Sequence, residues 1–170
     1  AYLRDGCGDC RATLLDCNVQ HTTLFPQVRR TRIIEMRGAD AVPPDLVCAL
    51  PAVWKGLLYD GEARAALRSR VSEWSFAQVD RLHVEVTRHG LAAAGPDAPV
   101  LEVAREVIDF AASGLRRINV RNRSGEDESL FLGPLYEILD RGKSPGEQLV
   151  EHWDGPWDRR IEPLVEFARY

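Results

Sequence analysis

The sequence predicts an α+β fold in which one β-strand, at about residues 29–37, is followed by a bundle of helices. Two observations support this prediction. The β-branched pair Ile33 and Ile34 precedes a "GAD" turn, which is typical of a strand that ends in a turn. Beyond residue 46, apolar residues recur mostly at helical spacing, most clearly in "VLEVAREVIDFAASGLRR" (100–117).

The helical elements can be taken in chain order. "RATLLDCNVQ" (11–20) is a candidate for a short helix, and Pro43 and Pro44 suit the first turn of another, where a missing N–H costs little. "LVCALPAVWKGLLYD" (46–60) is apolar nearly all round, which predicts a buried helix with a kink at Pro51. Further helices are predicted in "GEARAALRSRVSEW", "SFAQVDRLHVEVTRHG" with Ser75 as its N-cap, the 100–117 segment, "LFLGPLYEILDRG", "SPGEQLVEHWDG" and "WDRRIEPLVEFARY".

One strand by itself cannot form a sheet, because its backbone N–H and C=O groups need neighbouring strands as partners. Either residues 29–37 are not a strand, or the partner strands lie in another chain or in a missing part of the protein.

Composition excludes several functional classes. The 170 residues carry 22 basic and 26 acidic side chains interspersed along the chain, so a nucleic acid is not the expected main partner. No apolar run approaches the length of a membrane span, and the N-terminus lacks the features of an export signal. We therefore expect a cytoplasmic protein without a membrane partner. The initial Ala, in place of Met, suggests a processed or truncated chain.

Four cysteines raise the question of metal or redox chemistry. Cys7 and Cys10 form a CxxC, with Cys17 nearby and Cys48 distant. A structural zinc site usually needs two such pairs, and only His21 could complete this one. A labile disulfide within the CxxC, or free thiols, fits the spacing better. The expected compartment is reducing, and Cys48 is expected to be a buried thiol.

The stretch "RIIEMRGAD" (32–40) combines charged and apolar residues in one predicted strand. On a strand of period two, Glu35 and Arg37 share one face with Arg29, while Ile34 and Met36 occupy the other. The residues alone allow two interpretations. The charged face is either an ordinary cross-strand ion pair with a solvated arginine, or a site for phosphate or carboxylate.

Three ordered motifs favour the second interpretation. "TTLFPQVR" (22–29), "EMRGAD" (35–40) and "CALPAVWKGLLYD" (48–60) resemble the C-terminal part of the plant-type glutamate–cysteine ligase family. A looser similarity continues through "SEWSFAQVDRL", "GLAAAG", "SGLRR", "GKSPGEQLVEHWDGPW" and the terminal "FARY". The resemblance implies the helix-rich C-terminal portion of a glutamine-synthetase-like fold. Residues 1–20 would be an N-terminal segment with the CxxC, and residues 21–170 an incomplete part of the catalytic domain.

The resemblance also implies a reaction and its cofactors. Such ligases use ATP and Mg²⁺ to join the γ-carboxyl of L-glutamate to the amine of L-cysteine through a γ-glutamyl phosphate, the first step of glutathione biosynthesis. By the same resemblance, Glu35 would hold the metal and Arg37 would contact the transferring phosphate as the catalytic arginine. Arg29 would bind a nucleotide phosphate or the glutamate carboxylate, and the substrate pocket would include Thr22, Thr23 and Trp54.

Other interpretations remain open at this point. Cys17 and Gln20 stand where the family tends to have Trp and His. The family enzymes are more than twice as long, so the rest of the active site either lies in a second polypeptide or is absent here. The alternatives are a non-catalytic helical interaction module, a subunit of a split ligase, and a related carboxylate–amine ligase with another acceptor amine. Thr22 and Thr23 could also be helix-capping or turn residues, and Trp54 a core residue.

Overall fold

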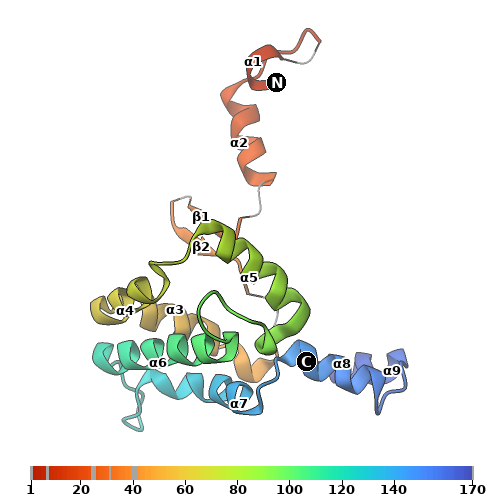
Figure 1. Ribbon diagram of the computed structural model, residues 1–170. Coiled ribbons are helices and arrows are strands. Elements are labelled where there is room, and N and C mark those ends of the chain that lie inside the picture. Colours follow the sequence, from red (N-terminus) through yellow and green to blue (C-terminus); the bar gives the residue numbers. More distant parts are fainter. Residues whose placement is uncertain (1, 7, 24–25, 31, 40–41, 170) are drawn as a thin grey trace. The chain divides into compact units, whose positions relative to one another are not determined.

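A computed structural model describes residues 2–6, 8–23, 26–30, 32–39 and 42–169. The chain divides into two compact units, an N-terminal unit (Ala1–Ala41) and a helical unit (Val42–Tyr170). The N-terminal unit contains the helices α1 (Tyr2–Asp5) and α2 (Leu14–Thr23) and the strands β1 (Val28–Arg30) and β2 (Ile34–Met36) (Figure 1). The sequence analysis divided the chain after residue 20, and this position lies inside α2. That the catalytic domain begins there stays a prediction.

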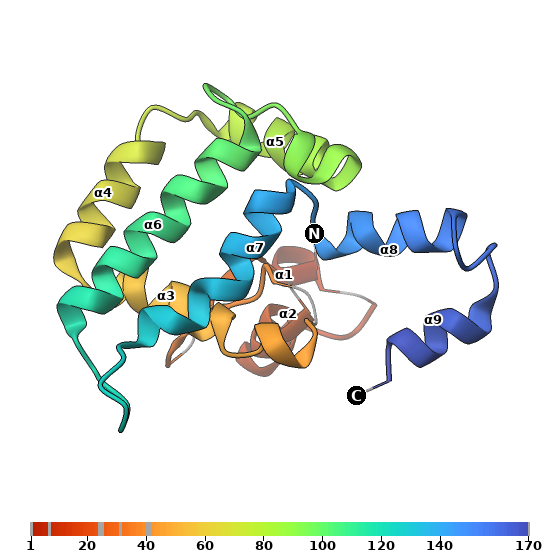
Figure 2. The same ribbon diagram turned by 90° about the horizontal axis from the view of Figure 1, so that it is seen from below.

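The elements described in the helical unit are α-helices and short 3₁₀ helices. They are η1 (Pro44–Leu46), α3 (Ala49–Tyr59), α4 (Gly61–Val71), α5 (Phe76–His89), η2 (Gly90–Ala92), α6 (Val100–Ile118), η3 (Glu128–Leu132), α7 (Gly133–Arg141), α8 (Pro145–Asp154) and α9 (Ile161–Phe167). α6 lies between α4 and α7 in both views, while α8 and α9 lead away from these helices (Figures 1 and 2). Among the helices that the structure describes, none combines the length and the hydropathy that a membrane span requires.

The prediction of one continuous strand over residues 29–37 was wrong. The segment is an antiparallel hairpin in which Val28 faces Met36, Arg29 faces Glu35 and Arg30 faces Ile34. It supplies its own partner strand because its two halves are close enough in sequence to pair across a short turn. Thr31, which the strand pattern places on the Glu35 face, lies outside the described residues.

The core of the helical unit forms where α3 and α6 cross. The kink predicted at Pro51 was also wrong, because α3 begins at Ala49 and Pro51 therefore lies in its first turn, where proline is tolerated. The helix is buried along one stripe only, since Leu50 and Tyr59 stay exposed. The buried residues that form the central cluster are Ala52, Leu57, Ala111, Ala112, Leu115 and Leu132.

Two glycines allow α3 and α6 to approach backbone to backbone. A Cβ atom built on Gly56 would lie 2.2 Å from the carbonyl oxygen of Ala111. A Cβ atom on Gly114 would lie 2.1 Å from the carbonyl oxygen of Gly56. Both distances are far below van der Waals contact, and backbone atoms cannot rotate out of the way as side-chain ends can. This crossing therefore requires glycine at both positions.

The predicted N-cap of α5 is confirmed. The hydroxyl oxygen of Ser75 accepts a hydrogen bond from the backbone N–H of Gln78 at 3.3 Å. In return, the side-chain oxygen of Gln78 accepts one from the backbone N–H of Ser75 at 2.9 Å. This reciprocal capping box satisfies backbone donors that would otherwise have no partner at the start of the helix. Ser144 and Glu147 form the same arrangement at the start of α8.

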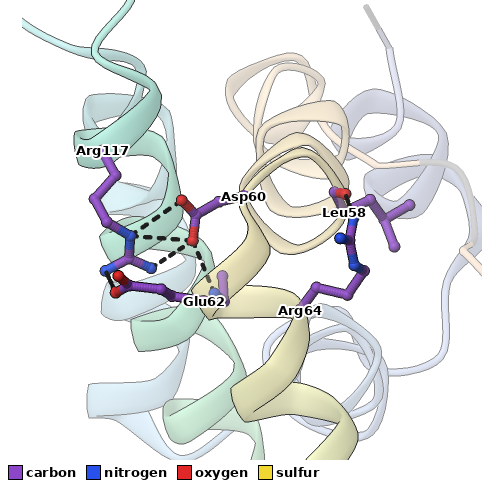
Figure 3. Close-up of polar contacts among 6 residues, drawn as sticks. Leu58, Asp60, Glu62, Arg64 and Arg117 are labelled. Carbon is purple, nitrogen blue, oxygen red and sulfur yellow. Dashed lines mark hydrogen bonds and ion pairs between the residues drawn. The ribbon is translucent and has the colours of Figure 1, made fainter.

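A polar network ties α6 to the junction of α3 and α4 (Figure 3). Asp60 separates the two helices, and its Oδ1 accepts hydrogen bonds from the Ala63 amide at 2.8 Å and from Nη2 of Arg117 at 2.6 Å. Glu62 lies farther from Arg117, with Oε2 3.4 Å from Nη1. The Arg117 guanidinium, followed by the Ala63 N–H, lowers the pKa of Asp60 to about 2.

We expect this network to make the helical unit sensitive to acid. Because the pKa of Asp60 is lower in the folded chain than the ordinary value of 3.8, its contribution is full above pH 4 and is lost as the pH falls toward 2. Asp60→Asn keeps an N-cap acceptor and removes the charge, so its melting temperature should be lower at pH 7 and change less between pH 4 and 2. Glu62→Gln is the matched control, because Glu62 makes the longer contact with Arg117. Its melting temperature should equal that of the wild type at each pH.

Candidate active site

Three charged side chains meet on one face of the β1–β2 hairpin. Arg29 donates from Nε to Oε2 of Glu35 at 2.9 Å, and its Nη2 lies 2.8 Å from the same oxygen. Nη1 of Arg37 lies 3.3 Å from the other carboxylate oxygen, Oε1. The register explains this arrangement, because directly opposed residues of an antiparallel pair project to the same face.

The cluster is only partly shielded from water. The exposed fractions of the side chains are 29% for Arg29, 37% for Glu35 and 23% for Arg37. Each guanidinium has five N–H donors, and two of them can bind a phosphate or carboxylate in a fork. The arrangement can therefore bind a small anion.

Glu35 also retains capacity for a cation. An ionised carboxylate has about four acceptor positions, and the two arginines use only some of those on Glu35. Within the ranges that the structure describes, no three His, Cys, Asp or Glu side chains are grouped to hold a metal. Mg²⁺ is commonly bound by one or two carboxylates together with water and nucleotide phosphates. Glu35 and its arginines thus fit a metal that a nucleotide also binds.

The cysteines are described only in part. Cys10, Cys17 and Cys48 are free thiols, which agrees with the second of the two interpretations of the CxxC, and Cys7 lies outside the described residues. The prediction that Cys48 is buried was wrong. Cys48 is the N-cap residue of α3, and its side chain is exposed while the next residue, Ala49, is the one that enters the core.

The two threonines proposed for the substrate pocket lie in the last turn of α2. The hydroxyl of Thr22 donates to the carbonyl oxygen of Val19 at 2.7 Å, and that of Thr23 donates to the carbonyl oxygen of Gln20 at 2.8 Å. These bonds are the local side-chain-to-backbone contacts that threonine makes within helices. Both side chains are exposed, and their role toward a substrate stays a prediction.

Trp54 belongs to the helical unit and packs against its central cluster, so it contributes to the core. Its neighbour Lys55 is paired, with Nζ 2.5 Å from Oε2 of Glu128. The structure thus brings together Arg29, Glu35 and Arg37, whereas Trp54 lies in the other unit. The direct pairing of Arg29 with Glu35 is the feature that the single-strand prediction missed.

Comparisons with known proteins agree with the motifs. The sequence profile of a family described as "Glutamate-cysteine ligase family 2(GCS2)" matches residues 4–166. The chain is 35% identical over 158 residues to the chloroplastic glutamate–cysteine ligase of Solanum lycopersicum, covering 93% of this chain and 29% of that enzyme. It is 37% identical over 149 residues to the chloroplastic enzyme of Arabidopsis thaliana, covering 88% and 27%. The chain therefore spans less than a third of the length of these curated relatives.

Proposed function

Because this chain belongs to glutamate–cysteine ligase family 2, we propose that it supplies the C-terminal portion of an ATP-dependent carboxylate–amine ligase. The reaction joins the γ-carboxyl of L-glutamate to the amine of L-cysteine. The observation that carries the proposal is Glu35 held between Arg29 and Arg37 on one face of the hairpin. The chain covers 29% of the Solanum lycopersicum (tomato) enzyme. The proposal therefore includes a composite site, in which the part of the enzyme not covered here supplies the other binding and catalytic groups.

The first step of the proposed reaction is phosphoryl transfer. The terminal phosphoryl group of ATP forms a bond to a γ-carboxylate oxygen of glutamate as its bond to ADP breaks. Negative charge is spread over the phosphoryl oxygens, so catalysis depends on positioning and neutralisation. We assign this task to Arg37, with Arg29 holding a nucleotide phosphate or the glutamate α-carboxylate.

A Mg²⁺ ion bound with the nucleotide would supply further charge neutralisation, and Glu35 is the residue of this chain that would hold it. In the second step the cysteine amine bonds to the acyl carbon, the carbon–oxygen bond to phosphate breaks and the amine loses a proton. No enzyme nucleophile is needed, because the acyl phosphate is already activated. Thr22, Thr23 and Trp54 belong to the proposal as substrate-contacting residues.

The fold and location of the whole enzyme also belong to this proposal. The hairpin and the helices would form part of a glutamine-synthetase-like fold that the rest of the enzyme completes. The relatives are named as chloroplastic, and for this chain we keep the cytoplasm as the predicted location.

A chimaera tests the function. In the tomato enzyme, the segment matched by this chain is replaced with residues 4–166, and formation of γ-glutamylcysteine and ADP is measured with glutamate, cysteine, ATP and Mg²⁺. We expect ATP-dependent product formation. A folded chimaera that forms no product with cysteine or with other amines, beside an active tomato enzyme, would reduce the chain to a non-catalytic module. Product with another amine alone would keep the ligase chemistry and change the acceptor.

A further inference from the structure

Gln27 extends the ladder of the β1–β2 hairpin by one pair beyond the strands. Its carbonyl oxygen accepts a hydrogen bond from the backbone N–H of Arg37 at 2.8 Å. The register of the two strands therefore continues with Gln27 directly opposite Arg37. Because side chains alternate between the two faces of a strand, Gln27 belongs to the face that carries Arg29 and Glu35. Gln27 thus adds an uncharged polar side chain to the candidate site.

The side-chain amide of Gln27 passes beside Arg37 and is available to a ligand. A Cβ atom built on the next residue, Gly38, would lie 2.8 Å from Oε1 of Gln27, so the missing side chain at Gly38 leaves the space that the amide occupies. Gln27 is exposed, and its amide makes no hydrogen bond to any residue that the structure describes. The amide therefore offers two N–H donors and one acceptor oxygen.

The charges of the site indicate which group of a substrate this amide suits. Both arginines are donors only, and Glu35 contacts both of them while its remaining acceptor positions are assigned to the metal. L-Glutamate has two carboxylates, which the arginines can bind, and an α-ammonium group, which needs an acceptor when it leaves water. Oε1 of Gln27 is an acceptor without charge, so it can bind the ammonium group without pairing with an arginine.

The spacing of the hairpin suits one small amino acid. Residues two positions apart on a strand, such as Gln27 and Arg29, are separated by roughly 6.5 Å. The Cβ atoms of directly opposed residues, such as Gln27 and Arg37, lie about 4.5–5.5 Å apart. Long side chains of these three residues can therefore reach different groups of the same ligand.

We infer that Gln27 is a further substrate-binding residue, whose Oε1 accepts a hydrogen bond from the α-ammonium group of L-glutamate. The inference rests on the proposed function and deepens it, because it names the residue that recognises the substrate as an α-amino acid. Arg29 then takes the α-carboxylate, one of its two proposed roles, and the γ-carboxylate lies toward Arg37, where the phosphoryl group is transferred.

The test uses Gln27→Met in the chimaera, because methionine keeps the length of the side chain and removes the amide. We expect KM for L-glutamate to rise about 10–100-fold, the usual effect of losing a hydrogen bond to a charged group. The value of kcat should stay unchanged, since the amide does not touch the reacting atoms. Gln148→Met is the matched control. Gln148 lies on α8 and pairs with Arg141, so this variant should keep the original KM.

Glutarate tests which group Gln27 binds. It has both carboxylates of glutamate and lacks the ammonium group, so its inhibition constant should be the same with and without Gln27→Met. An unchanged KM for L-glutamate would overturn the inference. So would an inhibition constant for glutarate that rises by the same factor as KM, because Gln27 would then support the site and not bind the ammonium group.

Binding of L-glutamate is also measured by titration calorimetry, so that the result for Gln27 does not depend on turnover. A chimaera that binds L-glutamate, loses affinity with Gln27→Met and forms no product would keep the inference and refute the proposed function. An active chimaera whose KM is unaffected by Gln27→Met would do the reverse. A folded chimaera that neither binds L-glutamate nor forms product would overturn both.

Discussion

Gly114→Ala should destabilise the helical unit by about 1–3 kcal/mol or more, although it adds only one methyl group. The new Cβ would lie 2.1 Å from the carbonyl oxygen of Gly56 and 3.1 Å from Cβ of Ala63. Relief requires α6 to move away from α3, which would open the packing around the buried Leu57 and Leu115. Chemical denaturation followed by circular dichroism gives the free energy of unfolding.

Gly133→Ala is the control for this prediction. Gly133 begins α7, and a Cβ built on it meets no atom within 4 Å. Alanine is the better helix former, so this variant should match or slightly exceed the wild type in stability. If Gly114→Ala is as stable as Gly133→Ala, the close crossing of α3 and α6 is not what holds the core together.

Glu35→Gln should lower kcat of the chimaeric ligase by about 10²–10³-fold, the usual effect of removing one electrostatic group from a catalytic site. The amide keeps the size of the carboxylate but removes the charge that Arg29 and Arg37 now contact, and with it the proposed metal ligand. Steady-state rates are measured over a range of Mg²⁺ concentrations. If Glu35 holds the metal, part of the lost activity should return at high Mg²⁺.

The control for Glu35→Gln is Glu137→Gln. Glu137 also pairs with an arginine, at 3.0 Å from Arg141, but on the exposed side of α7. This variant should retain wild-type kcat and melting temperature. If the two variants have the same kcat, Glu35 has no role in catalysis. The Arg29–Glu35 contact would then be an ordinary cross-strand ion pair.

The helical part of the fold and the family could be predicted from the sequence alone. The apolar stripe of α6, the N-cap at Ser75 and the motifs around "EMRGAD" are local signals, and each follows from residues a few positions apart. The family profile over residues 4–166 confirms the resemblance that these motifs indicated. Local patterns also placed Glu35 and Arg37 side by side, because a period of two depends on the backbone only.

Only the tertiary structure decided what those elements contact. Periodicity could not reveal that residues 28–36 turn back on themselves, so that Arg29 meets Glu35 across a hairpin. Nor could it show that Gly56 and Gly114, 58 positions apart, allow two helix backbones to touch, since the fit depends on the crossing of α3 and α6. Sequence patterns report which face of an element avoids water, whereas the atoms that cover that face come from segments distant in the chain.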